Sequence, residues 1–299
     1  MLVNLLLSLL LLQPFSNIYA SDISFLGIGE SVQSQPERIN QENVGVVVNA
    51  DKFVAIDVNS GKVLLQKNSN VQQPIASITK LMTTLVILDQ KPNWQMPVEM
   101  LEQDETVGAY PHIYRGEEVL FIDLWKAALV TSDNNAIKAM IRALGFRESQ
   151  FVSLMNMKAK DLQMYNSKFA DPTGLNENNI STALDVSRLV HNAMRENEIR
   201  ESVLQGKYEF NILNNKKLRK IYNTDILVDS FLNSPKYGYE LIGGKTGYLP
   251  EAGYCLSVEI KQNENQVLIV VLNSDNINSR FYDVKVIADW VYSNYSWSK

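Results

Sequence analysis

The chain has 299 residues, 45% of them apolar and 20% charged, which is the composition of a globular protein whose core is large enough to fold without disulfides. Its net charge is −5, whereas proteins that bind phosphate backbones carry positive charge, so nucleic acid is not expected as a partner. One cysteine and two histidines, without zinc-type or dithiol spacing, exclude a zinc centre and dithiol redox chemistry, and no metal or cofactor is expected.

An apolar segment opens the chain. Residues 2–12 are too short a run to span a bilayer, and the small residue Ala20 follows at the distance typical of a signal-peptide cleavage site. This pattern predicts a secretory signal peptide over 1–20, although no Lys or Arg precedes the run; the alternatives are a short membrane anchor and a buried strand. We expect residues 21–299 to be exported to the periplasm without a stable membrane anchor, because no later segment resembles a transmembrane helix.

The polar stretch that follows has no apolar periodicity and predicts a flexible lead over 21–45, before a single domain over 46–299. Strands at both ends of a helical middle predict a mixed α/β fold, in which an antiparallel sheet is flanked by helices and a helical lobe lies beside it. The expected elements are a hairpin within 46–67, helices from Ser77 and at 122–144, 148–163, 182–196 and 279–294, and strands at 241–248, 253–261 and 266–273.

Ser77 and Lys80 form an S-x-x-K pattern at the start of the first predicted helix. Residues three apart lie on one face of a helix, so the lysine amine can reach the serine hydroxyl. A serine becomes a nucleophile when a neighbouring base takes its proton, and a buried lysine that is kept neutral can be that base. Because the pattern is short and recurs by chance, it indicates a catalytic serine only together with further motifs.

Two further motifs follow in the chain. Ser132, Asp133 and Asn134 come after an apolar helical run, where a polar triplet is usually a cap, although Ser132 could relay a proton and Asn134 could offer its amide to Lys80 and a substrate. The segment GGKTG over 243–247 is predicted on a strand, and it does not fit the phosphate-binding Walker pattern. A strand with so little side-chain bulk lets a peptide lie along it.

The three motifs in this order resemble the penicillin-recognising serine peptidases, with S-x-x-K, S-D-N and K-T-G. The chain is similar to their low-molecular-mass penicillin-binding proteins, the D-alanyl-D-alanine carboxypeptidases and endopeptidases of cell-wall remodelling, which implies a β-lactamase/DD-peptidase-like fold. The segments that carry this resemblance are PIASITKLMT (74–83), PTGL (172–175), STA (181–183), NT (223–224) and KTGYLPEAGYCL (245–256).

The resemblance implies a role for each motif residue. Ser77 attacks the D-alanyl carbonyl, and Lys80 is its base, kept neutral by partial burial and by Lys245. Ser132 completes the proton relay. The remaining implied contacts are Asn134 on the substrate amide, the backbone amides of Ser77 and Tyr248 in the oxyanion hole beside Gly247, and Lys245 and Thr246 on the substrate carboxylate, helped by Arg280. The alternative for Arg280 is a solvated cation at a helix start.

The implied substrates are peptidoglycan stem peptides, and β-lactams are the implied covalent inhibitors. We expect a D-alanyl-D-alanine endopeptidase that cuts cross-links, because carboxypeptidases of this family commonly carry a further C-terminal domain that these 299 residues do not contain. Removal of the terminal D-Ala by a carboxypeptidase is the alternative, and the sequence does not decide between these two reactions.

Three rival interpretations are weaker. A class A β-lactamase has a Glu in an E-x-x-L-N pattern that activates the deacylating water, and here Pro172 stands at that position. A silent wall-binding protein has no need of both a nucleophile and its base. A generic exported protein would match three ordered motifs only by chance. Outside the motifs, Cys255 is expected to be a buried apolar side chain, and His112 is not expected to contact substrate.

Overall fold

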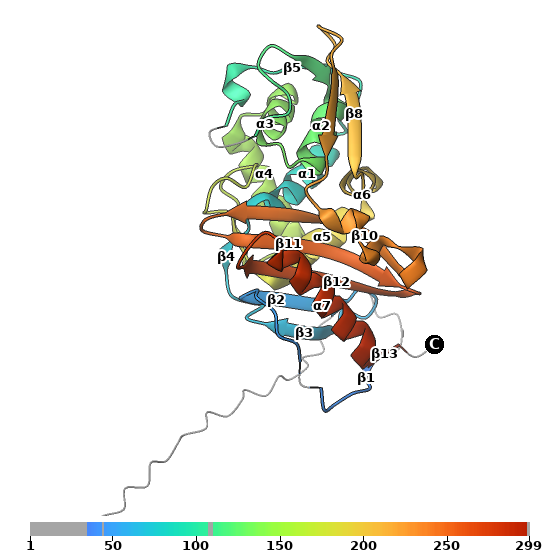
Figure 1. Cartoon of the computed structure of the whole chain (residues 1–299). Coiled ribbons are helices and arrows are strands. Elements are labelled where there is room, and N and C mark those ends of the chain that lie inside the picture. Colours follow the sequence, from blue (N-terminus) through green and yellow to red (C-terminus); the bar gives the residue numbers. More distant parts are fainter. Residues whose placement is uncertain (1–34, 44, 107–109, 298–299) are drawn as a thin grey trace, which may run out of the picture.

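The computed structural model describes residues 35–43, 45–106 and 110–297. Its centre is a five-stranded antiparallel sheet with the strand order β10-β11-β12-β2-β3 (Figure 1). Strands from the two ends of the chain therefore lie side by side, as the sequence predicts. The bounds are Lys52–Asp57 for β2, Val63–Lys67 for β3, Tyr239–Leu249 for β10, Gly253–Gln262 for β11 and Asn265–Ser274 for β12.

The two faces of the sheet belong to two separate hydrophobic cores, because successive strand residues point to opposite faces. Val54 and Ile56 lie in the core shared with α5 (Ala183–Arg195), whereas Phe53 and Ala55 lie in the core shared with α7 (Ser279–Asn294). Helices thus cover both faces, with α7 in front of the sheet in Figure 1 and α5 behind it. The predicted fold class is confirmed.

A helical lobe lies beside the sheet, above it in Figure 1. Its first helix, α1, is buried from residue 79 to residue 87, so it runs through the centre of the lobe. The lobe consists of α1 (Thr79–Asp89), α2 (Phe121–Val130), α3 (Asn134–Ala143), α4 (Glu148–Asp161), α6 (Asn197–Val203) and the strand pairs β5 (Pro97–Glu99) with β6 (Glu118–Leu120) and β8 (Lys207–Asn211) with β9 (Leu218–Tyr222).

The prediction of one helix over 122–144 is wrong, since the chain breaks it into α2 and α3 at Ser132. Ser132 has a φ of 63°, in the left-handed region that costs a residue other than glycine about 1–3 kcal/mol. A helix cannot continue through such a residue. The hairpin of β8 and β9 was not predicted.

The remaining elements are short. They are η1 (Ala76–Ile78), η2 (Glu102–Asp104), η3 (Ile226–Asp229), η4 (Phe231–Asn233), η5 (Pro235–Tyr237) and the pair β4 (Gln73–Pro74) with β7 (Ile180–Ser181).

The N-terminal segment differs from the expected flexible lead where the structure describes it. β1 (Glu37–Arg38) pairs with β13 (Tyr295–Ser296), and the Arg38 guanidinium lies 5.4 Å from the ring centre of Trp290. Backbone pairing and an aromatic partner fix this segment, and periodicity cannot reveal either contact in so short a strand. The predicted signal peptide, 1–20, lies outside the described residues. None of the helices in the described part of the chain has both the length and the apolarity to cross a membrane.

Candidate active site

Ser77 lies in the single turn η1 that leads into α1, where the helical lobe meets the sheet. Lys80 follows one turn later on α1, and its Nζ lies 2.9 Å from the Ser77 Oγ. The spacing of the S-x-x-K pattern therefore brings the amine to the hydroxyl, as expected from helix geometry.

The Lys80 amine has two further partners. It lies 2.5 Å from the Asn134 Oδ1 and 2.7 Å from the backbone oxygen of Thr173. Amide oxygens only accept hydrogen bonds. A neutral amine at this position therefore donates its two protons to these oxygens and turns its lone pair toward the Ser77 hydroxyl, which is the arrangement that a general base requires.

Burial is the main reason why the Lys80 amine can be neutral. The side chain is fully buried, which lowers its pKa to about 7, against the opposing effect of Asp171 and Asp133. The expectation of partial burial is thus corrected to complete burial. Repulsion between the two lysines affects the pKa of Lys245, which Lys80 helps to lower.

The Thr173 carbonyl is held in place by the loop that carries it. The Asp171 carboxylate accepts hydrogen bonds from the Thr173, Gly174 and Asn176 backbone amides at 2.9, 3.1 and 3.2 Å. Gly174 has a φ of 89°, and a Cβ there would lie 2.2 Å from the Ala76 oxygen, so only glycine fits against the turn that carries Ser77. Thr173 lies within the segment PTGL that carried the family resemblance, but its role as a backbone acceptor has no side-chain signature.

Ser132 and Lys245 meet from opposite walls of the site. The Lys245 Nζ lies 3.0 Å from the Ser132 Oγ and 3.2 Å from the Thr246 backbone oxygen. Lys245 is fully buried, and burial together with Lys80 and Arg280 holds its pKa well below the usual range, with Asp225 opposing. The left-handed backbone of Ser132 turns its side chain into the site, where it bridges the sheet and the lobe.

Asn134 is the first residue of α3, and the preceding residue, Asp133, caps that helix by accepting from the Ala136 amide at 3.1 Å. Such a cap satisfies a backbone donor that would otherwise be left unpaired. The aspartate of the S-D-N motif is therefore structural, and it fixes the two flanking residues that face Lys80 and Lys245.

β10 forms the opposite wall. The Thr246 Oγ1 lies 2.8 Å from the Thr224 Oγ1, and Tyr248 is half exposed and stacks on Tyr254 with 4.2 Å between ring centres. A Cβ on Gly247 would lie 2.9 Å from the Ile75 oxygen. The strand can thus approach the turn that carries Ser77 only because residue 247 lacks a side chain.

Arg280, near the start of α7, is not the solvated cation of the alternative interpretation. Only 6% of the residue is exposed, and its Nη1 donates to the Gly247 oxygen at 3.1 Å. Its Nε is buried without a hydrogen-bond partner among the described residues. The structure therefore places Arg280 at the sheet side of the site, facing the loop end of β10.

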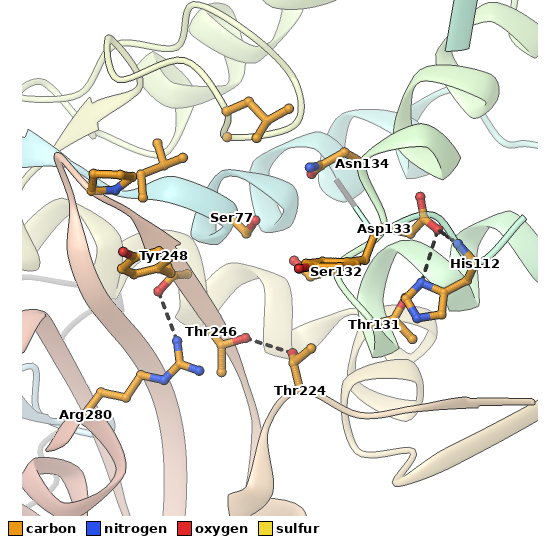
Figure 2. A pocket seen from close by; sticks show the side chains of 16 residues that line it. Ser77, His112, Thr131, Ser132, Asp133, Asn134, Thr224, Thr246, Tyr248 and Arg280 are labelled. Carbon is orange, nitrogen blue, oxygen red and sulfur yellow. Dashed lines mark hydrogen bonds and ion pairs between the residues drawn. The ribbon is translucent and has the colours of Figure 1, made fainter. Parts of the chain in front are cut away.

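A cleft of about 410 Å³ lies between the sheet and the helical lobe, and its lining includes Ser77, Ser132, Asn134, Thr246, Tyr248 and Arg280. Figure 2 shows Ser77 between the β10 wall and the S-D-N segment, with Arg280 and His112 at opposite sides. His112 lines the cleft, and so do Thr224 and Leu175, to which sequence reasoning had given no role.

Comparison with known proteins agrees with this geometry. The family model Peptidase S11, D-alanyl-D-alanine carboxypeptidase, matches residues 37–276. The chain belongs to this family. The resemblance seen in the motifs is confirmed, and the family makes the protein a serine-type peptidase.

Some relatives are named D-alanyl-D-alanine endopeptidase and others D-alanyl-D-alanine carboxypeptidase. A D-alanyl-D-alanine endopeptidase of Haemophilus influenzae is 33% identical over 78% of this chain and 77% of its own length, and one of Pseudomonas aeruginosa is 31% identical over 79% and 74%. The carboxypeptidase DacF of Bacillus subtilis is 31% identical over 82% of this chain and 63% of its own length. The crystal structure of the Streptomyces K15 DD-transpeptidase superposes with a TM-score of 0.76, at 25% identity over 83% and 98% of the two chains.

Proposed function

We propose that this family member is a serine DD-peptidase that cleaves D-alanyl bonds of peptidoglycan stem peptides through an acyl-enzyme on Ser77. The contact between the Lys80 amine and the Ser77 hydroxyl carries the proposal, because it joins a nucleophile to a buried base. The enzyme acts in the periplasm. Cleavage removes the signal peptide, residues 1–20, and the catalytic domain comprises residues 46–299.

The reaction follows from the positions of these groups. Lys80 takes the proton of Ser77 while the Oγ attacks the D-alanyl carbonyl carbon, and the developing oxyanion is stabilised by the backbone amides of Ser77 and Tyr248. When the C–N bond breaks, the proton returns to the leaving amine through the hydroxyl of Ser132. Water then hydrolyses the ester and regenerates the serine.

Substrate binding uses the sheet wall of the cleft. Lys245, Thr246 and Arg280 hold the carboxylate of the leaving residue, and Asn134 and β10 hold the peptide backbone. Repulsion from Arg280 helps to lower the pKa of Lys245. An incoming carboxylate relieves this repulsion, which favours an anionic group at that position.

Cleavage of cross-links is the favoured reaction, with removal of the terminal D-Ala as the second candidate. The relatives named endopeptidase match 74–77% of their own lengths, against 63% for the carboxypeptidase DacF. β-Lactams are the expected covalent inhibitors, since they acylate the same serine.

The test incubates the purified chain with cross-linked muropeptide dimers and with pentapeptide monomers, beside the Ser77→Ala variant, and identifies products by mass spectrometry. Splitting of dimers supports the endopeptidase, and loss of one alanine from monomers alone supports the carboxypeptidase. The absence of any Ser77-dependent product from either substrate contradicts the proposed function.

A further inference from the structure

The rim of the cleft at the end of β10 is apolar. Tyr248, Leu249 and Pro250 follow one another there and line the cleft, whereas the S-D-N segment on the opposite wall is polar. Tyr248 is 49% exposed. In Figure 2 it lies on the same side of Ser77 as Arg280, opposite the S-D-N segment. An aromatic ring that is exposed within a concave site offers a contact surface to an apolar group of a ligand.

The ring of Tyr248 is supported from behind. Its partner across the strand pair is Tyr254 on β11, and the two rings stack with 4.2 Å between their centres and 27° between their planes. The Arg280 guanidinium lies 5.6 Å from the centre of the Tyr254 ring, and its Nη1 donates to the Gly247 oxygen. One face of the Tyr248 ring is thus covered by Tyr254, and the exposed part of the side chain is left for a ligand.

This exposed ring lies next to the position assigned to the carboxylate of the leaving residue. Thr246 and Tyr248 are two positions apart on β10, so their side chains point to the same face of the sheet, about 7 Å apart along the strand. In the proposed function, Thr246 and Arg280 hold that carboxylate. The carboxylate and the side chain of an amino acid branch from the same Cα. A side chain as long as a butyl group can therefore reach the Tyr248 ring, and the methyl group of alanine is too short.

We propose that the exposed ring of Tyr248 binds the aliphatic side chain of the leaving residue, and that the cleft thereby prefers leaving groups larger than alanine. This role rests on the proposed function. A cross-link joins the D-alanyl carbonyl to an amine of a second stem peptide, so its leaving group carries more aliphatic chain than a terminal D-Ala. Tyr248 is thus a specificity residue that favours cross-links over terminal D-Ala.

The test compares two peptides that are identical up to the D-alanyl carbonyl and end in D-alanine or in D-norleucine. The side chain of D-norleucine is an unbranched, uncharged butyl group, so the two peptides differ only in the apolar contact. Both require Ser77, Lys80 and the carboxylate contacts, and the ratio of their kcat/KM values cancels these contributions. Because the ring removes part of the butyl group from water, we expect the wild-type protein to prefer D-norleucine by about tenfold.

Variants of the two stacked tyrosines separate the ring from the backbone. In Tyr248→Ala the ratio should fall toward one, whatever the absolute rates, because the backbone amide of residue 248 serves both peptides equally. Tyr248→Phe keeps the ring and should keep the preference. Tyr254→Ala removes the support and should lower the ratio, whereas Tyr254→Phe should retain it. The matched control is Tyr165→Ala, since Tyr165 is an exposed tyrosine between α4 and β7 that does not line the cleft, and this variant should keep the preference.

A wild-type ratio near or below one, or a preference that survives in Tyr248→Ala, overturns the assignment. Either result leaves the proposed function intact, because D-alanine is still released. If neither peptide is cleaved and a penicillin does not acylate Ser77, the proposed function fails, and the role of Tyr248 fails with it.

Discussion

The Lys80 Nζ lies 2.9 Å from the Ser77 Oγ, while its other two contacts are oxygens that can only accept. This geometry leaves the lone pair of a neutral amine no partner but the Ser77 hydroxyl. The reactivity of the serine is therefore tied to the protonation of one buried lysine.

Acylation should depend on pH through Lys80. The pKa of this amine is lowered to about 7, and only the neutral form can take a proton, so the acylation rate should rise as pH increases through about 7. The measurement is the second-order rate of labelling by a fluorescent penicillin between about pH 5 and pH 9. In the Lys80→Ala variant the rate should fall by about a hundredfold or more, with unfolding still cooperative. A flat profile, or a near-normal rate in the variant, removes Lys80 from this role.

Stability should also reflect the buried amine. Because the pKa of Lys80 falls from 10.5 in the unfolded chain to about 7 in the fold, the unfolded state binds more protons between these values. The free energy of unfolding should therefore increase with pH in this window, by up to about 1.4 kcal/mol per unit from this one group. Denaturant unfolding from about pH 7.5 to 9.5 measures the slope. The Lys80→Met variant should lack this contribution, and equal slopes in both proteins contradict it.

Gly247→Ala should impair acylation because the added side chain crowds the turn that carries Ser77. The added Cβ would lie 2.9 Å from the Ile75 oxygen and 3.2 Å from the Ser77 nitrogen, so β10 or η1 must shift. We expect the rate of penicillin labelling to fall by about tenfold or more, because misplaced oxyanion donors lose much of their effect. Gly206→Ala is the matched control, since its Cβ would meet no atom closer than 3.8 Å. Similar rates for both variants would show that the close approach is not required.

The penicilloyl enzyme should be long-lived. Asp133 is the acidic residue among those that line the described cleft, and its carboxylate is occupied by the Ala136 and His112 amides. The nearby Asp171 binds the amides of its own loop. Neither carboxylate is free to activate a deacylating water, so the adduct should persist for many minutes after excess penicillin is removed. Intact-mass measurements over time test this, and rapid return to the unmodified mass would favour a β-lactamase.

The sequence predicted the parts of the fold and site that depend on local patterns. Apolar periodicity located α4, α5, α7 and the three long C-terminal strands, and the spacing of Ser77 and Lys80 placed the amine on the hydroxyl. Ordered motifs indicated which distant segments meet.

The features that were missed depend on tertiary contacts. The break at Ser132 follows from a left-handed serine, and neither glycine nor proline marks that position. The Thr173 carbonyl and the loop that holds it involve backbone groups, which leave no residue-type signature. His112 reaches the cleft because Asp133 and Arg219, 21 and 107 positions away, bind its backbone. The apolar periodicity of a sequence gives no information on contacts between residues that are so far apart in the chain.

The covalent adduct tests the central claim most directly. The chain and its Ser77→Ala variant are incubated with a penicillin, and the modified residue is mapped by proteolysis and mass spectrometry. We predict one penicilloyl group per chain, located on the peptide that contains Ser77, and no adduct in the variant. An adduct on another residue, or one that persists in Ser77→Ala, would contradict the assignment of Ser77 as the nucleophile.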